Sequence, residues 1–470
     1  AGSSRASRFF CLYEVFEWTN NDNDMKKVVF ILVLGVIMMG CNAKDNRRIA
    51  SSQGSSQVPV EPKSHYGMSY EGDDDGNGNG VPPTTTPLQQ SATSFQVDVY
   101  LENSGSMNGY VDAGKTDFQQ NVFNYLDDVE QWLGSQLNLF FINNKIIPKG
   151  NLLDDYITKL TPNDFKSSGG STSTTDIADL FRLVLEQGND SVVSILVSDF
   201  IFSPGTQNNP EAYLGDQQVK IKRAFENYLN MHSDLAVMVY QLYSNLKGTY
   251  YDYLNTPHKN YVGQRPYYIW VIGHPLKIAE MRVAIPENRF LHKVENFWSI
   301  TSLSPNIENY AILPNPKKGS FNKLGKDGMN KMKKDTQGEF MFTIGADLGV
   351  LDLILGSDYL LDTDHYARII NKQTADDWYI TVSPNTIPTS PATHNISLFS
   401  KGNLPKGDFE LAICRKKPKW ADDYTDMDDR TLDDSNQTKT YGLHFIFDGI
   451  VQAYSAKCGD YYSSMNFKMN

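Results

Sequence analysis

One stretch near residue 100 constrains this chain more than any other. Its first half, Phe95–Leu101, alternates apolar with polar side chains, which is the two-residue period of a β-strand. The strand leads into Glu102-Asn103-Ser104-Gly105-Ser106-Met107, where a carboxylate and two hydroxyls occupy alternate positions. In an extended turn these three side chains project to one side and can offer oxygens to a hard cation such as Mg²⁺. The segment therefore predicts a strand that ends in a cluster of oxygen ligands.

Two later segments supply further oxygens. The first runs from Gly169 to Ile177 and contains the hydroxyls of Thr174 and Thr175. The second is the apolar run Val192–Val197, which leads to Asp199 and has the composition of a buried parallel strand. A third hydroxyl and a second carboxylate are thus predicted at the ends of separate elements.

The order of the elements predicts how these segments come together. Apolar residues at helical spacing predict helices over 117–133, 175–187 and 217–231 and from about residue 275. Strands are predicted between them, over 137–142, 191–197, 235–243 and 267–272. Such alternation favours an α/β fold with a doubly wound, mostly parallel, Rossmann-like sheet and helices on both faces. Ligands of such sheets bind at the carboxyl ends of the strands, which is where Glu102–Ser106 and Asp199 stand.

The combined pattern resembles the von Willebrand factor A domain. The metal-ion-dependent adhesion site of that family is built from Asp-x-Ser-x-Ser, a distant Thr and a distant Asp. By this resemblance Ser104, Ser106 and Thr175 (or Thr174) would hold a divalent cation such as Mg²⁺, and Glu102 and Asp199 would supply negative charge. An open coordination position would then take a carboxylate from a partner. The chain departs from the family at Glu102, which stands in place of an Asp and is one methylene longer.

Two other interpretations fit the same region. In the first, Ser104-Gly105-Ser106 is only a tight strand-to-helix turn, its hydroxyls cap the next helix, and Glu102 is solvated. In the second, Gly109–Thr116 matches the phosphate-binding pattern G-x-x-x-x-G-K-[ST], and Asp199 is the magnesium-holding acid of a nucleotide site. Against the second, Glu102–Asn108 separates the strand from the first glycine of the pattern.

After about residue 286 the helical period fades and short apolar runs take over. They include 340–344, 378–382, 396–399, 409–414 and 443–447, separated by turn residues, and they predict a β-rich domain for which a sandwich is one arrangement. Between the two parts, Ser244–Arg265 is rich in Tyr and Asn and is predicted to be a long surface loop. Its Tyr250, Tyr251 and Tyr253 could stack on a sugar ring or a protein partner, or pack the loop onto its own domain.

The beginning of the chain has the pattern of a secretory address. Met25-Lys26-Lys27 is followed by an apolar run and by Gly40-Cys41, which looks like a bacterial lipobox with acylation of Cys41. We therefore expect residues 25–40 to be a signal peptide, residues 1–24 to lie outside the mature protein, and 41–93 to form a disordered tether rich in Ser, Gly and Asn. The folded part would comprise an A-type domain over 94–285 and the β-rich domain over 286–470.

Composition narrows the functional classes. A formal charge of -12 argues against a nucleic-acid partner, and contact with a membrane would be through the lipid anchor only. Of the four cysteines, Cys414 and Cys458 would remain after processing, either as a disulfide or as two free thiols. The sequence contains no His-Glu-x-x-His and no Gly-x-Ser-x-Gly at Ser106, so we predict no enzyme. The leading hypothesis is an envelope lipoprotein that binds a protein or glycan; a metal-free structural scaffold is the alternative, and nucleotide binding is third.

Overall fold

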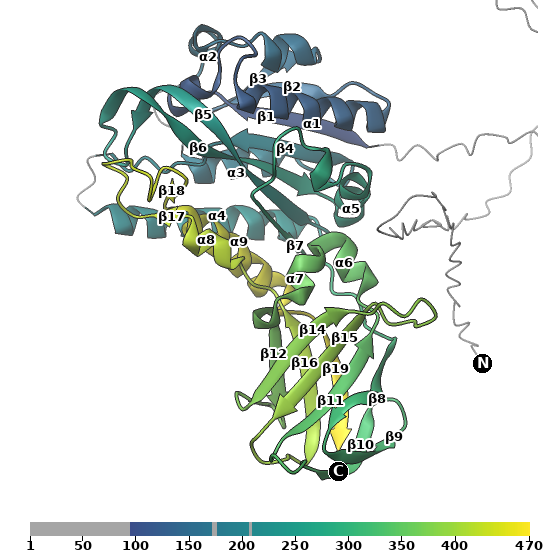
Figure 1. The fold of residues 1–470 in the computed structure, drawn as a ribbon. Coiled ribbons are helices and arrows are strands. Elements are labelled where there is room, and N and C mark those ends of the chain that lie inside the picture. The colour runs from purple at the N-terminus through teal and green to yellow at the C-terminus, as the bar shows by residue number, and fades with distance from the viewer. Residues whose placement is uncertain (1–94, 172–175, 206–208) are drawn as a thin grey trace, which may run out of the picture. The chain divides into compact units, whose positions relative to one another are not determined.

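The computed structural model describes residues 95–171, 176–205 and 209–470. The first part of the fold is built on a seven-stranded sheet with the order β3-β2-β1-β4-β6-β5-β7 (Figure 1). Its strands are β1 (Gln96–Glu102), β2 (Asn138–Ile142), β3 (Ile146–Gly150), β4 (Val192–Ser198), β5 (Ala236–Tyr251), β6 (Pro257–Gly273) and β7 (Asn296–Thr301). The expected strands 137–142, 191–197, 235–243 and 267–272 all lie within this sheet.

The sheet is mixed, which corrects the prediction of a mostly parallel one. Strand β1 runs parallel to both of its neighbours, β2 and β4, but the other four neighbouring pairs are antiparallel. The reason is that β5 and β6 form one long hairpin, so that β6 returns beside β4 in the opposite direction. The fold is therefore mixed α/β, with a parallel centre and antiparallel margins.

Helices cover both faces of this sheet, as expected. Side chains of Val97, Val99 and Leu101 face the core that contains α1 (Asp117–Leu133) and α5 (Pro275–Ala284). The intervening Tyr100 faces the other core, which contains α3 (Ile177–Gln187) and α4 (Pro210–Met231). The two-residue alternation of a strand thus divides β1 between two apolar layers. Shorter helices in this region are η1 (Ser106–Tyr110), η2 (Asp154–Thr158), α2 (Pro162–Ser167) and η3 (Glu287–Arg289).

The segment Ser244–Arg265, predicted as a surface loop, is instead the outer part of the β5–β6 hairpin. Cross-strand pairing continues from Tyr243 opposite Pro266 as far as Tyr251 opposite Pro257. The backbone groups of this polar segment are therefore paired with each other. The strands were not predicted because the segment is polar. One side of the hairpin faces water, so the sequence has no apolar run there.

The second part of the fold consists of two antiparallel-rich sheets. One contains β8 (Tyr310–Lys318), β11 (Phe340–Ala346), β14 (Trp378–Pro384) and β15 (His394–Ser400) in the order β14-β15-β11-β8. The other has the order β13-β12-β16-β19-β10-β9 and contains β9 (Ser320–Leu324), β10 (Gly328–Lys333), β12 (Tyr366–Ile370), β13 (Gln373–Thr374), β16 (Gly407–Cys414) and β19 (Tyr461–Met469). Phe342 and Trp378 belong to the four-stranded sheet, and Phe409 belongs to the six-stranded one. The ring centroids of Phe342 and Trp378 lie 6.0 Å and 5.3 Å from that of Phe409. The two sheets therefore pack face to face as a sandwich.

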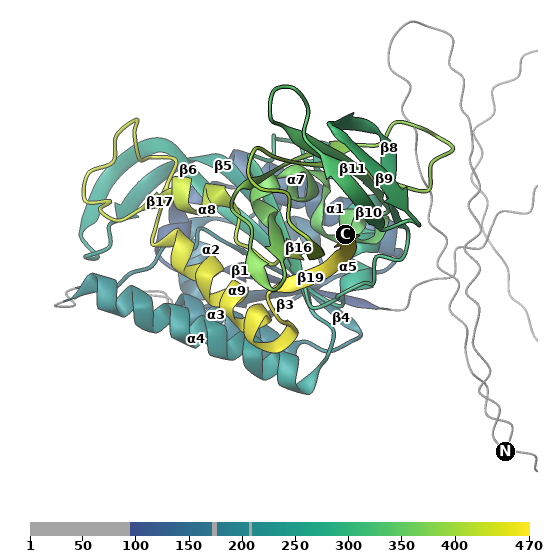
Figure 2. The same cartoon turned by 90° about the horizontal axis from the view of Figure 1, so that it is seen from below.

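The chain then returns to the first sheet. Helix α9 (Leu443–Cys458) lies beside α4 (Figure 2). Its Phe447 packs against Trp270 of β6 and Trp298 of β7. The run 443–447 is one of the apolar runs that predict a β-rich domain, and the sequence leaves 445–454 open between a helix and a strand; both lie in helix α9. Strand β7 is part of the seven-stranded sheet, and α9 packs in one of its apolar layers. Both elements follow residue 286, so the first part of the fold extends beyond the boundary expected at 285–286. The remaining short elements are α6 (Gly349–Leu355), α7 (Ser357–Leu361), η4 (Thr363–His365), α8 (Lys419–Asp423), β17 (Thr425–Asp426) and β18 (Thr440–Tyr441).

The signal peptide, Cys41 and the tether lie outside the described residues, so their assignment stays a prediction. Among the helices that the structure describes, none combines the length and apolar character that crossing a membrane requires.

Candidate functional site

The carboxyl ends of β1 and β4 bring two carboxylates together. These strands are parallel neighbours, with Leu101 opposite Val197, so Glu102 and Asp199 reach the same edge of the sheet. Both are almost fully buried, at 4% and 2% exposure. The hydroxyl of Ser198 donates a hydrogen bond to Oε2 of Glu102. Glu102 is therefore not solvated, which corrects the interpretation of this segment as a simple turn.

The two serines after β1 lie at the same place. Oγ of Ser104 is 2.9 Å from Oγ of Ser106, and Ser104 is buried while Ser106 is half-buried. The N-cap residue of η1 is Gly105, so neither serine occupies the capping position. The side-chain amide of Asn103 anchors the turn by donating to the carbonyl of Phe165 at 3.2 Å. The turn thus holds both hydroxyls beside the carboxylates without using them for capping.

Asp199 has an environment that disfavours its ionised form. Burial and the nearby charge of Glu102 raise its pKa to about 7, although interactions with Ser106 and the Ile201 amide oppose the shift. One carboxylate oxygen, Oδ2, is buried and has no hydrogen-bond partner among the described residues. An unpartnered buried oxygen of this kind calls for a proton, a water or a cation as its missing partner.

The residue after Asp199 holds a strained backbone. Phe200 has φ of 52°, a conformation that a bulky side chain rarely adopts and that costs about 1–2 kcal/mol. Its ring is fully buried against Phe181 and Trp270, and its amide donates to Oγ of Ser198 at 2.9 Å. The core therefore forces the turn that points Asp199 toward Glu102. Strain maintained by packing is a recurrent feature of functional sites.

The predicted third hydroxyl cannot be placed in the same way, since Thr174 and Thr175 lie outside the described residues. The loop before them is anchored next to the site: Nδ2 of Asn143 donates to Oδ1 of Asn103 at 2.9 Å and to the carbonyl of Gly169 at 3.0 Å. Gly170 has φ of +80°, and a Cβ there would collide with the Asn143 amide. After the loop, Asp176 caps α3.

The donor set fits a hard divalent cation. Two carboxylates and two hydroxyls are oxygen ligands of the type that Mg²⁺ takes, and Mg²⁺ commonly retains several waters. A cation would also offset the repulsion that raises the pKa of Asp199 and would occupy its unpartnered oxygen. Among the described residues, no group of three or more His, Cys, Asp and Glu side chains is arranged for a metal. The candidate site therefore depends on its hydroxyls as well as on its two acids.

A buried arginine next to this site was not predicted from the sequence. Arg265 of β6 has no exposed surface, and within the described part of the chain Nε and Nη2 of its guanidinium have no hydrogen-bond partner. Its positive charge partly opposes the rise in the pKa of Asp199. Its guanidinium lies 4.7 Å from the ring centre of Tyr250. Its one hydrogen bond, from Nη1, goes to the carbonyl of Gln437 at 3.0 Å. Only the pairing of the β5–β6 hairpin brings this residue to the site, so local sequence held no signal for it.

The three tyrosines predicted as weak ligand-binding residues have mainly internal contacts. Tyr250 is buried and its hydroxyl donates to Asp429, while the ring of Tyr253 stacks on Tyr441 with centroids 4.8 Å apart. Tyr251 ends β5 and is half-buried. These contacts match the alternative in which the tyrosines pack this segment onto its own fold.

The segment Gly109–Thr116 is occupied by its own hydrogen bonds. The amides of Asp112 and Gly114 donate to Oε1 of Gln119 at 2.8 Å and 3.0 Å. Gly109 lies under Leu246 of the hairpin, to which a Cβ would come within 2.5 Å. A phosphate-binding loop needs free backbone amides, so this geometry does not favour the nucleotide interpretation.

Cys414 and Cys458, weighed as a disulfide or as two thiols, are free cysteines in the structure. Cys414 ends β16 and is buried, and Cys458 is half-buried at the end of α9. Burial raises the pKa of both thiols, so neither is an activated nucleophile.

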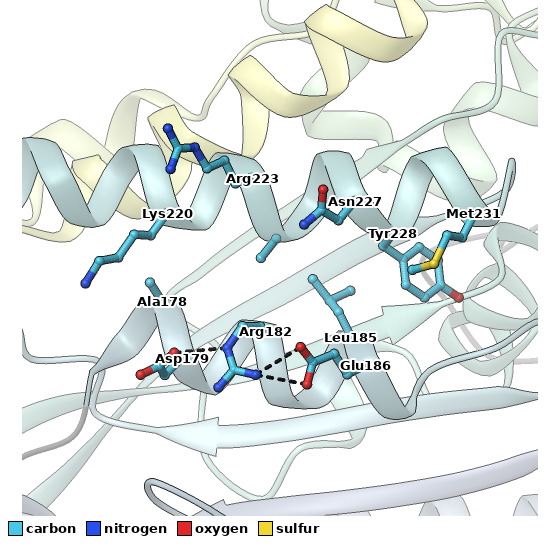
Figure 3. A pocket seen from close by; sticks show the side chains of 11 residues that line it. Ala178, Asp179, Arg182, Leu185, Glu186, Lys220, Arg223, Asn227, Tyr228 and Met231 are labelled. Carbon is cyan, nitrogen blue, oxygen red and sulfur yellow. Dashed lines mark hydrogen bonds and ion pairs between the residues drawn. The ribbon is translucent and has the colours of Figure 1, made fainter.

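A hollow of about 240 Å³ lies between α3 and α4 (Figure 3). Arg182 bonds to both Asp179 and Glu186 at 2.9–3.0 Å, while Lys220 and Arg223 add two further positive charges to the lining. None of the predicted site residues lines it. The hollow is therefore separate from the candidate site at the carboxyl ends of β1 and β4.

Comparison with known proteins adds no identification: no family model matches the chain, and no curated protein or solved structure is significantly similar to it.

Proposed function

We propose that this protein binds a protein or glycan ligand through a divalent cation held by Glu102, Ser104, Ser106 and Asp199. The observation that carries the proposal is the convergence of these residues on one edge of the sheet, with Oδ2 of the buried Asp199 left without a partner. Thr175, which the resemblance adds to the set, lies outside the described residues.

The roles follow from chemistry and burial. Glu102 and Asp199 supply the negative charge, and the hydroxyls of Ser104 and Ser106 supply neutral oxygens that allow a small ion to keep water or accept an external ligand. Ser106 is more exposed than Ser104, so the ligand is expected to approach on its side. A carboxylate would suit this approach, because its oxygens are ligands that hard cations such as Mg²⁺ prefer.

A metal-free scaffold is the second candidate. It is favoured by the hydrogen bonds that the site already contains, from Ser198 to Glu102 and between Ser104 and Ser106. In that case Asp199 would be protonated near neutral pH, which its pKa of about 7 permits.

Calorimetric titration of Mg²⁺ and Mn²⁺ into the full chain separates the two. The cation site predicts saturable binding in the wild type that is abolished in Ser104→Ala and in Asp199→Ala. Asp112→Ala is the matched control, since this exposed acid belongs to the neighbouring loop and should leave binding unchanged. Absence of binding in the wild type would leave the scaffold.

The envelope location is a separate part of the proposal, carried by the lipobox-like Gly40-Cys41. In producing cells, fractionation should place the wild-type protein with membranes and release Cys41→Ser from them. If both proteins fractionate alike, the lipid anchor is wrong while the cation site remains untouched.

A further inference from the structure

A second hollow, of about 400 Å³, lies in the sandwich where the end of β16 meets the starts of β12 and β19. Three cations line it, Arg368, Arg415 and Lys416, against one acid, Asp460. The remaining lining consists of Tyr366, Ala367, Thr374, Cys414 and Tyr461. This hollow is positively charged in a chain whose net charge is -12.

The three cations are not neutralised by carboxylates. Arg415 directs its donors mainly at backbone carbonyls, including those of Gly459 at 2.8 Å and Leu303 at 3.2 Å. Nζ of Lys416 donates to the carbonyl of Asp364 at 2.7 Å. Carbonyls satisfy the hydrogen bonds of these groups but leave their charge in place, so the hollow attracts anions.

Arg368 provides a more specific signal. Its Nε is buried without an acceptor, and within the described part of the chain its guanidinium forms no hydrogen bond or ion pair. The side chain as a whole is half-buried and lines the hollow, so the other donors of its guanidinium are available to an anion there. The planar fork of a guanidinium matches two oxygens of a carboxylate or phosphate.

We propose that this hollow binds the dianionic oxyanion of a small molecule, such as a phosphate group. Arg368 grips two of its oxygens, and Lys416, which is exposed, adds a mobile positive charge at the entrance. Arg415 is held by the backbone and contributes a fixed positive charge. Three cations against one carboxylate leave a formal charge of +2, which matches a dianion better than a monoanion.

The test is calorimetric titration of inorganic phosphate into the full chain near pH 7.5, without divalent cations and at ionic strength held constant with chloride. Saturable phosphate binding is expected, with acetate binding about tenfold more weakly because it carries one charge. Arg368→Gln and Lys416→Gln should each weaken phosphate binding about tenfold or more. Lys323→Gln, an exposed lysine of β9 at the opposite edge of the same sheet, should behave like the wild type.

Three results would overturn the proposal: no phosphate binding by the wild type, equal binding by wild type and both pocket variants, or acetate binding more tightly than phosphate. Lys416 lies on the surface, so Lys416→Gln gives a valid answer even if Arg368→Gln fails to fold. The candidate cation site shares no residue with this hollow, so neither result depends on the other.

Discussion

At the scale of single residues, two buried carboxylates at the ends of parallel strands have conflicting requirements. Glu102 and Asp199 are both buried, and the charge of Glu102 disfavours ionisation of Asp199. The structure responds by raising the pKa of Asp199 to about 7. The protonation of this one side chain therefore couples the stability of the fold to pH and to cations.

The direction of that coupling can be predicted. The folded-state pKa of Asp199 exceeds its ordinary value of 3.8, so the folded protein holds the extra proton between these values. This contribution to stability is present below about pH 4 and is lost as the pH rises through about 7. We expect the metal-free wild type to lose more stability than Asp199→Asn between pH 5 and 7.5, as measured by urea unfolding.

Other titrating groups make the matched variant necessary. Asp429, with a pKa raised to about 6 by burial, contributes in the same direction. Burial lowers the pKa values of His365, His394 and His444, which contribute in the opposite direction. Parallel pH profiles for wild type and Asp199→Asn would contradict the assignment. Saturating Mg²⁺ should restore stability to the wild type most strongly above pH 7.

Arg415 offers a second prediction at this scale. Its guanidinium donates to the carbonyl of Thr301 at the end of β7 and to those of Cys458 and Gly459 at the end of α9, at 2.8–3.3 Å. Arg415→Met keeps much of the side-chain volume but leaves these buried carbonyls without a donor. We expect it to lower the free energy of unfolding by about 3 kcal/mol or more.

The control for Arg415 is an arginine with surface ion pairs. Arg182 bonds to Asp179 and Glu186 on the exposed side of α3. Arg182→Ala should cost less than about 1 kcal/mol, since exposed helix-surface pairs are weak. Similar losses in the two variants, measured by chemical unfolding, would show that the carbonyl network around Arg415 is not a main support.

At the scale of elements, the β5–β6 hairpin determines the surroundings of the candidate site. It contributes Arg265 and Tyr250. Its Leu246 packs on Gly109 of η1, the short helix that begins at Ser106. The absence of a side chain at Gly109 allows this approach. The hairpin and the turn should therefore be energetically coupled.

A double-mutant cycle measures this coupling. Gly109→Ala alone places a Cβ 2.5 Å from Cγ of Leu246 and should destabilise the protein by about 1–3 kcal/mol. Combining it with Leu246→Ala removes the clash, so the double variant should lose less than the sum of the two single losses. Additive losses in thermal or chemical unfolding would mean that the hairpin does not rest on Gly109.

At the scale of the whole molecule, the described residues share continuous packing between the first sheet and the sandwich. One apolar cluster includes Trp270 and Trp298 of the first sheet, Phe447 of α9, and Trp378 of the sandwich. Gly449 of α9 lies against α4 so closely that a Cβ would be 2.7 Å from the carbonyl oxygen of Gln218. Helix α9 thus links the last part of the chain to the first sheet.

This packing predicts that the two parts unfold together. Calorimetry should show one transition, and tryptophan fluorescence should report the same midpoint. Gly449→Leu should lower that midpoint by forcing α9 away from α4, whereas Ser455→Ala, on a half-buried position of the same helix, should have little effect. Two separated transitions in the wild type would instead favour independent domains with a boundary near residue 286.

The sequence alone determined what depends on near neighbours. Apolar spacing defined α1 at its observed ends and β4 within one residue, and the strand-end positions of Glu102 and Asp199 followed from the element order. These predictions held because helical and strand periods are local properties, and because parallel neighbours end at the same edge.

Only the tertiary structure decided the rest. Strand direction at the sheet margins, the hairpin in Ser244–Arg265 and the helical state of 443–447 depend on partners far away in the chain. Arg265 and Arg368 are recognised as candidate binding residues only because the fold places them near groups more than 40 residues away. Arg265 lies near Asp199, and Arg368 lines the same hollow as Cys414. A segment without clear helical or strand periodicity takes the conformation that its tertiary contacts stabilise. Those contacts form only when the chain folds.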